Sequence, residues 1–183
     1  MLTAPSIYPI ALGFAAFAGW RGVARRLPAG QIAARVLLAV YLGWLIGATL
    51  FPLPLQGIAG GEGLAGVLNH PNFVPFATIG ETLALPGLWP RVRLLGGNVL
   101  VFAPVGLLLP TIWPRLARLR RIALAGLLVS LSLELGQLAV SLLLGTWYRM
   151  SDIDDVLLNV GGVLLGYELL LALRRRSSRP PVA

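Results

Sequence analysis

The chain has 183 residues, of which 57% are hydrophobic and only 12% are charged, with a mean hydropathy of +0.81. Soluble domains carry about 25% charged residues. The composition therefore excludes a water-soluble globular protein and an intrinsically disordered one, and it indicates a membrane protein. Cysteine is absent, which also excludes disulfides, thiolate metal sites and cysteine nucleophiles.

The net charge is +8, and all fifteen basic residues are arginines. They occur in short clusters between long apolar runs rather than along one polar helix face. Basic residues placed in this way set the orientation of a membrane protein, so we expect no nucleic-acid partner.

Five apolar segments approach the length of about 20 residues that a bilayer-crossing helix needs. We therefore predict an all-α integral membrane protein, a bundle of about five transmembrane helices forming one domain over residues 1–175. The predicted spans are Thr3–Trp20, Ile32–Pro52, Leu94–Trp113, Ile122–Gly145 and Ile153–Leu173.

The first span is the shortest, and Ala16-Phe17-Ala18 is similar to a signal-peptide cleavage site. However, its arginines follow the apolar run instead of preceding it. This order of charges predicts a retained helix with the N-terminus outside the cell.

The distribution of all fifteen arginines agrees with that orientation. With five spans, twelve of them fall on one side, which is then the cytoplasmic side, and three fall on the other. The sequence thus predicts a multi-pass protein of the bacterial cytoplasmic membrane with a cytoplasmic C-terminus. The twelve are Arg21, Arg25, Arg26, Arg35, Arg115, Arg118, Arg120, Arg121, Arg174, Arg175, Arg176 and Arg179.

One connection is long. Residues Leu53–Arg93, between the second and third spans, are rich in Gly and Pro yet fairly apolar. We expect this extracytoplasmic loop to lie on the outer leaflet or to dip into it. The basic tail, residues 176–183, is expected to be a disordered cytoplasmic segment.

Polar residues share one face of the fourth span. Glu134 lies twelve residues into that span, roughly 18 Å from its start at about 1.5 Å per residue. An ionisable group near mid-bilayer is costly and marks a functional site by default. Ser130, Gln137 and Ser141 follow the same face as Glu134.

The third and fifth spans contribute further polar groups. Asn98 lies about one turn inside the third span, and Pro104 further along removes a backbone hydrogen bond, which is expected to weaken that helix. Asp152, Asp155 and Asn159 form a stripe at the start of the fifth span, which Gly162 and Gly166 continue.

Several of these features have ordinary structural explanations. Asp152, Asp154 and Asp155 suit the first turn of a helix, where acidic residues favour the macrodipole. Gly162 and Gly166 fit small-xxx-small helix packing, as do Gly43 and Gly47. A divalent cation on the three acids is the weaker alternative, because no usual ligand spacing is present. We therefore expect no metal and no cofactor.

Together these groups predict a polar cavity open to the outer face, with Glu134 as its floor and Arg149 over its rim. Arg149 suits a phosphate or carboxylate through its planar guanidinium. The candidate ligand-binding residues are Asn98, Glu134, Gln137, Arg149, Asp152, Asp155 and Asn159.

The chain resembles the VanZ-like family of bacterial membrane proteins between residues 72 and 166. The resemblance rests on four motifs that occur in order: Asn72-Phe73-Val74-Pro75-Phe76; Asn98-x-x-x-Phe102-x-Pro104-x-Gly106-x-x-Leu109-Pro110; Ser130-x-x-x-Glu134-x-x-Gln137; and Arg149-x-x-Asp152-x-x-Asp155-x-x-x-Asn159-x-Gly161-Gly162-x-x-x-Gly166. Asp154 falls at a variable place in the family pattern, so we rank it below Asp152 and Asp155.

The resemblance implies an integral protein of the cell envelope. Its founding member is associated with resistance to teicoplanin, a glycopeptide that binds wall precursors outside the cell. We expect an accessory protein that binds membrane lipids, a lipid-linked wall precursor or a glycopeptide. The alternative is a membrane-embedded enzyme that modifies an envelope lipid or its head group, with Glu134 as general acid or base.

Overall fold

The computed structural model describes residues 4–51, 63–69, 71–145 and 151–177. Within them, five helices are long and apolar enough to cross a membrane, which confirms the predicted all-α membrane fold. These spans are Pro5–Ala24, Ala29–Leu50, Leu88–Ile112, Leu119–Leu144 and Ile153–Ser177. The last helix runs through Arg174–Arg176 to Ser177, so part of the predicted tail is helical.

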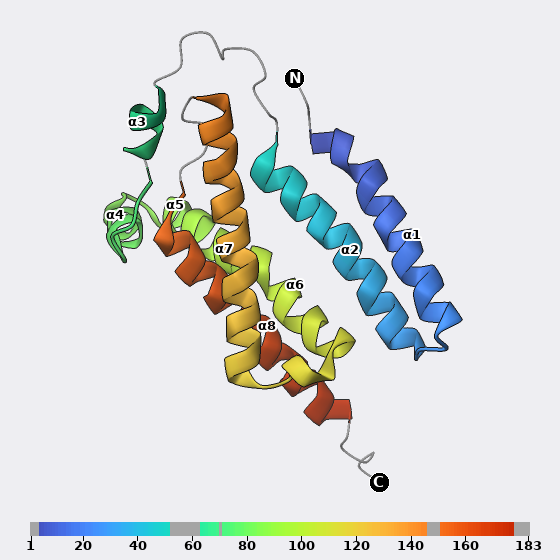
Figure 1. Ribbon diagram of the computed structural model, residues 1–183. Helices are drawn as coiled ribbons and strands as arrows, with labels where there is room; N and C mark the ends of the chain where they lie inside the picture. Colours follow the sequence, from blue (N-terminus) through green and yellow to red (C-terminus); the bar gives the residue numbers. More distant parts are fainter. Residues whose placement is uncertain (1–3, 52–62, 70, 146–150, 178–183) are drawn as a thin grey trace.

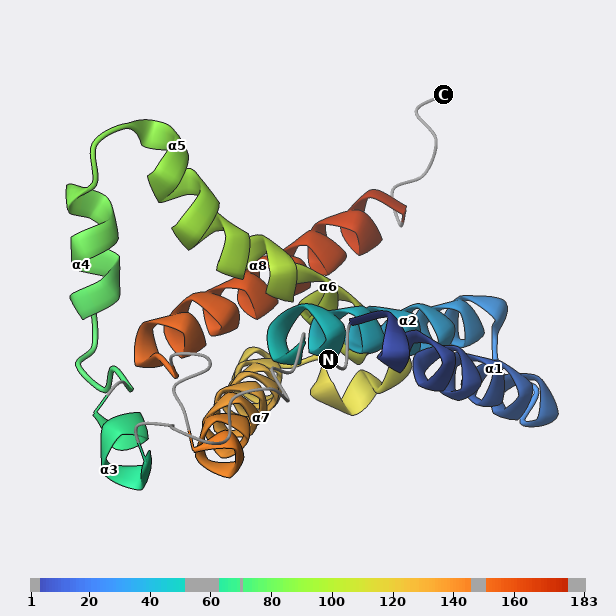
Figure 2. The same ribbon diagram turned by 90° about the horizontal axis from the view of Figure 1, so that it is seen from above.

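The spans form two groups that meet at α2. Helices α1 (Tyr8–Ala24) and α2 (Ala29–Leu50) form an antiparallel hairpin, and α2 packs against α6 (Gly97–Ile112) (Figure 1). Helices α7 (Leu119–Leu144) and α8 (Ile153–Ser177) complete the bundle, and α6 crosses α8 in the view of Figure 2.

The α1–α2 turn, the α6–α7 link and the last turn of α8 lie at one end of the bundle (Figure 1). All three predicted cytoplasmic arginine clusters belong to these segments, although Arg179 is outside the described residues. We call this end the arginine end.

The closest helix packing lies between α6 and α8. A Cβ atom on Gly166 would come within 1.8 Å of the carbonyl oxygen of Ala103, and one on Gly162 within 2.1 Å of that of Val99. Gly106 is equally close to the backbone of α8. The glycine pair of the fifth span therefore allows two backbones to approach, as small-residue membrane interfaces do.

The third span begins earlier than predicted. Helix α5 (Leu88–Arg91) continues through a π-helical turn, Val92–Gly96, into α6. The weakening expected at Pro104 does not interrupt the helix, because α6 runs through Pro104 to Ile112. Ala103 and Gly106, on either side of Pro104, lie against the backbone of α8.

The long connection between α2 and α6 is partly helical where it is described. It contains α3 (Gly63–Leu68), α4 (Ala77–Ala84) and α5. Of these, α4 packs against α8 and α3 against α7. Large apolar side chains of this connection are exposed, including Leu88 and Trp89.

Candidate functional site

The start of α8 is joined to the segment before α4 by an isolated parallel β-bridge between Asn72 and Asp152. The backbone N–H of Asn72 donates to Ser151 at 2.9 Å, and that of Ile153 donates to Asn72 at 3.0 Å. The Asp152 carboxylate also accepts bonds from the Asn72 amide at 3.0 Å and the Thr78 hydroxyl at 2.5 Å. This carboxylate is therefore a junction between α8 and the long connection.

Asp154 makes a second attachment at the same place. Its side chain is completely buried. Its two carboxylate oxygens accept the backbone N–H groups of Phe76, at 2.5 Å, and Ile79, at 3.0 Å. These amides belong to the start of α4, where helical N–H groups lack partners within the helix. Asp154 thus caps α4 from α8, and a carboxylate there also suits the helix dipole.

These attachments fix an exposed apolar turn. Phe73, Val74 and Phe76 are 70%, 65% and 67% exposed, and we call them the apolar tip. Phe76 has a φ of 67°, in the left-handed region that costs a residue with a side chain about 1–2 kcal/mol. The two hydrogen-bonded carboxylates of α8 offset this cost, because they hold the backbone on either side of the tip.

Glu134 ties the middle of α7 to the start of α8. Its carboxylate accepts the backbone N–H of Asp152 at 3.0 Å, and its carbonyl accepts the Ser151 hydroxyl at 3.0 Å. Glu134 is 8% exposed. Buried polar groups need such partners, and Glu134 finds its partner in the backbone of the neighbouring helix.

Two further contacts bind α8 to its neighbours. The Asn98 amide donates to the Asp155 carboxylate, which joins α6 to the first turn of α8. The Asn159 amide donates to the Ser130 hydroxyl at 2.9 Å, while its Oδ1 is buried without a hydrogen-bond partner. Since Ser130 precedes Glu134 by one helical turn, Asn159 lies nearer the arginine end than Glu134, the reverse of the expected depth.

Gln137 belongs to a different contact. Its side chain donates to the carbonyl of Thr49 at 3.3 Å and so joins α7 to α2. Arg149 lies outside the described residues. The structure therefore brings Glu134, Asp152, Asp155, Asn98 and Asn159 together around the start of α8, with Gln137 one turn further along α7.

The predicted site residues did not include Asn72, Thr78 or Asp154. Asn72 opens the first of the quoted motifs, which was the available signal for it. Asp154 was ranked below its neighbours because of its place in the family pattern, yet it is the most deeply buried of the three acids. Nothing in the local sequence marks Thr78.

A small cavity of about 60 Å³ lies beside this network. Phe73, Leu131, Leu135 and Val156 are among its walls, and Glu134 also lines it. Its lining is mostly apolar. The larger polar cavity open to the outer face stays a prediction.

Among the residues that the structure describes, no group of three or more His, Asp or Glu side chains is arranged to hold a metal ion. The donors to Asp152 and Asp154 are backbone N–H groups and the neutral side chains of Asn72 and Thr78.

The fold and these contacts define a multi-pass helical membrane protein whose long connection is clamped to its last span by buried acids. The family model described as VanZ/LLP1 matches residues 38–174, which include α6, α7, most of α8 and the apolar tip. The chain belongs to the VanZ/LLP1 family. No curated protein and no solved structure matches the chain.

Proposed function

We propose that this protein is a non-catalytic accessory factor of the bacterial cell envelope that binds a lipid-linked envelope molecule or a lipid-bearing glycopeptide such as teicoplanin. Membership of the VanZ/LLP1 family supports an envelope role. The binding surface would be the apolar tip together with the polar groups around the start of α8.

One observation carries the proposal. Asp152 and Asp154 hold a turn in which two aromatic side chains, Phe73 and Phe76, remain largely exposed. Burying carboxylates costs desolvation free energy even when they are hydrogen-bonded. A loop that only connected two spans would not need them. A rigid apolar tip beside hydrogen-bonding groups suits a ligand with both a lipid chain and a polar head, because little conformational freedom is lost on binding.

The proposed orientation puts this surface outside the cell. The apolar tip lies away from the arginine end, and arginine-rich connections are retained on the cytoplasmic side. Wall precursors and glycopeptides meet outside the membrane, so a protein oriented in this way presents its tip where they occur.

A membrane-embedded enzyme remains the second candidate. It is favoured by the buried carboxyl group of Glu134, which lines the same small cavity as Asp152. Glu134 would act as general acid or base on an envelope lipid or its head group. Incubation of the purified protein with total envelope lipids separates the candidates. A mass-shifted product that is lost in Glu134→Gln supports the enzyme, and the accessory role predicts no product.

Photo-crosslinking tests the binding surface. A photoreactive phenylalanine analogue at position 73 or 76 is expected to capture teicoplanin or a lipid-linked wall precursor in intact cells. The matched control is the same analogue at Phe14, which is 65% exposed on α1. Capture at all three positions to the same extent would indicate general contact with lipid and would contradict the proposal.

A further inference from the structure

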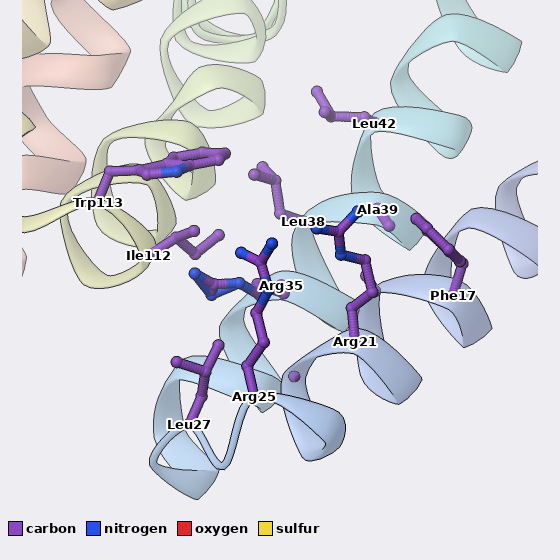
Figure 3. A pocket seen from close by; sticks show the side chains of 12 residues that line it. Phe17, Arg21, Arg25, Leu27, Arg35, Leu38, Ala39, Leu42, Ile112 and Trp113 are labelled. Atoms are coloured by element: carbon purple, nitrogen blue, oxygen red, sulfur yellow. The ribbon is translucent and has the colours of Figure 1, made fainter.

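A separate cavity of about 310 Å³ lies at the arginine end, between α1, α2 and the end of α6 (Figure 3). Its walls are of two kinds. Three arginines, Arg21, Arg25 and Arg35, line it together with an apolar set of side chains. The main apolar residues are Phe17, Leu27, Leu38, Leu42, Ile112 and Trp113.

Figure 3 shows the side chains of the three arginines at the same cavity. Arg21 belongs to α1, Arg25 is the first residue after the end of α1, and Arg35 belongs to α2. No acidic side chain lines the cavity. Like charges that line one cavity repel, and the lining offers no carboxylate to offset this repulsion. Arg21 is also held in position, because its guanidinium lies 5.6 Å from the centre of the Phe17 ring.

One of these guanidinium groups lacks a hydrogen-bond acceptor. The Nη1 atom of Arg35 is buried and has no hydrogen-bond partner. A buried charged donor is costly without an acceptor. By contrast, Arg121 at the same end of the bundle donates to the carbonyl of Arg115 at 2.8 Å. Arg35 therefore carries an unsatisfied charged donor at the wall of the cavity.

We propose that this cavity binds the phosphate of an anionic phospholipid, with an acyl chain along the apolar wall. Arg21, Arg25 and Arg35 would contact the phosphate oxygens, for which guanidinium groups are well suited. Basic pockets between transmembrane helices at the cytoplasmic side are typical sites for such head groups.

The apolar wall favours a lipid over free phosphate. Leu38 and Leu42 continue along α2 from the arginines toward the middle of the bundle, and Phe17 faces them from α1. A small inorganic anion would leave this surface uncovered, whereas an acyl chain would cover it. The exposed ring of Trp113, at the end of α6, is typical of the depth where head groups meet acyl chains.

The test is native mass spectrometry of the full chain in detergent, titrated separately with phosphatidylglycerol and phosphatidylcholine of identical acyl chains. Phosphatidylglycerol is expected to bind more tightly. Arg35→Gln is expected to weaken that binding about fivefold, which corresponds to about 1 kcal/mol for one arginine near the head groups. The double variant Arg21→Gln/Arg25→Gln alters only exposed side chains. It is expected to weaken phosphatidylglycerol binding more than Arg35→Gln does.

The matched control is Arg120→Gln, which removes an exposed arginine at the same end of the bundle but outside the cavity. It is expected to leave phosphatidylglycerol binding unchanged. Equal affinity for both lipids, or an equal loss in Arg120→Gln, would overturn the proposal. Displacement of the lipid by inorganic phosphate at matched ionic strength would instead identify a free-anion site and would overturn the lipid assignment.

Discussion

The carboxylate of Asp154 accepts the backbone N–H of Phe76 at 2.5 Å, across 78 positions of the chain. This contact joins the last transmembrane helix to the turn that presents the apolar tip. It also holds Phe76 at a positive φ that its side chain disfavours. The position of the tip therefore depends on an acid in a different span.

Asp154→Asn tests this dependence. An amide side chain retains one acceptor oxygen, so one of the two backbone N–H groups at the start of α4 loses its partner. Loss of a hydrogen bond to a charged group costs about 1.5–3 kcal/mol. We expect faster amide hydrogen exchange at residues 76–79 and a lower unfolding temperature in detergent. Glu81→Gln, at an exposed acid of α4, should change neither. Unchanged exchange at residues 76–79 would show that Asp154 does not hold the turn.

The glycine contact between α6 and α8 predicts a sharp positional effect. Gly166→Ala would put a methyl group against the carbonyl oxygen of Ala103, and overpacking of this kind costs about 1–3 kcal/mol. Gly161→Ala, five residues earlier on another face of α8, would place its methyl group with nothing within 4 Å and should leave stability unchanged or improved. The free energy of unfolding of both variants in bicelles measures the difference. Equal stability of the two would contradict the close crossing of the helices.

The C-terminal end of α1 has a strained backbone position that a glycine would relieve. The N–H groups of Arg26 and Leu27 donate to the carbonyls of Val23 and Gly22, the bond pattern of a Schellman motif. Glycine usually occupies the left-handed position of this motif, but here Arg26 does, with a φ of 52°.

Arg26→Gly is therefore expected to raise the free energy of unfolding by about 1 kcal/mol. Ala33→Gly, in the interior of α2, should lower it by about 1 kcal/mol, because glycine is a poor helix former. Denaturant titration in mixed micelles measures both changes. Destabilisation by Arg26→Gly would mean that the Arg26 side chain makes a larger contribution than its backbone strain.

Glu134 is predicted to act chiefly through its acceptor oxygen. Glu134→Gln keeps an acceptor for the Asp152 N–H, so we expect a folded protein with a small loss of stability. Glu134→Leu removes the acceptor and leaves a buried N–H unpaired, which costs about 1–3 kcal/mol. Thermal unfolding in detergent compares the two variants. If both variants lost the same amount of stability, the contribution of Glu134 would come from its charge and not from its acceptor oxygen.

The sequence predicted the five spans well because each is a long apolar run, and composition alone defines such a run. It also predicted the glycine packing of α8, since Gly162 and Gly166 share one helix face. These are local features with a periodicity that can be counted along the chain.

The site was predicted less completely, because its contacts join distant segments. The hydrogen bond between Thr78 and Asp152 joins residues 74 positions apart, and no local sequence pattern predicts it. Asp154 was ranked low because it falls at a variable place in the family pattern. In the structure it faces α4, a short helix that the sequence analysis treated only as part of a loop.

The most direct test of the account is the teicoplanin susceptibility of a host that expresses the wild type, Phe73→Ala/Phe76→Ala or Phe14→Ala at matched membrane levels. The proposed role predicts that the wild type and Phe14→Ala protect equally, and that the double variant protects little or not at all. Equal protection by the double variant, or no protection by the wild type, would contradict a glycopeptide-related role of the apolar tip.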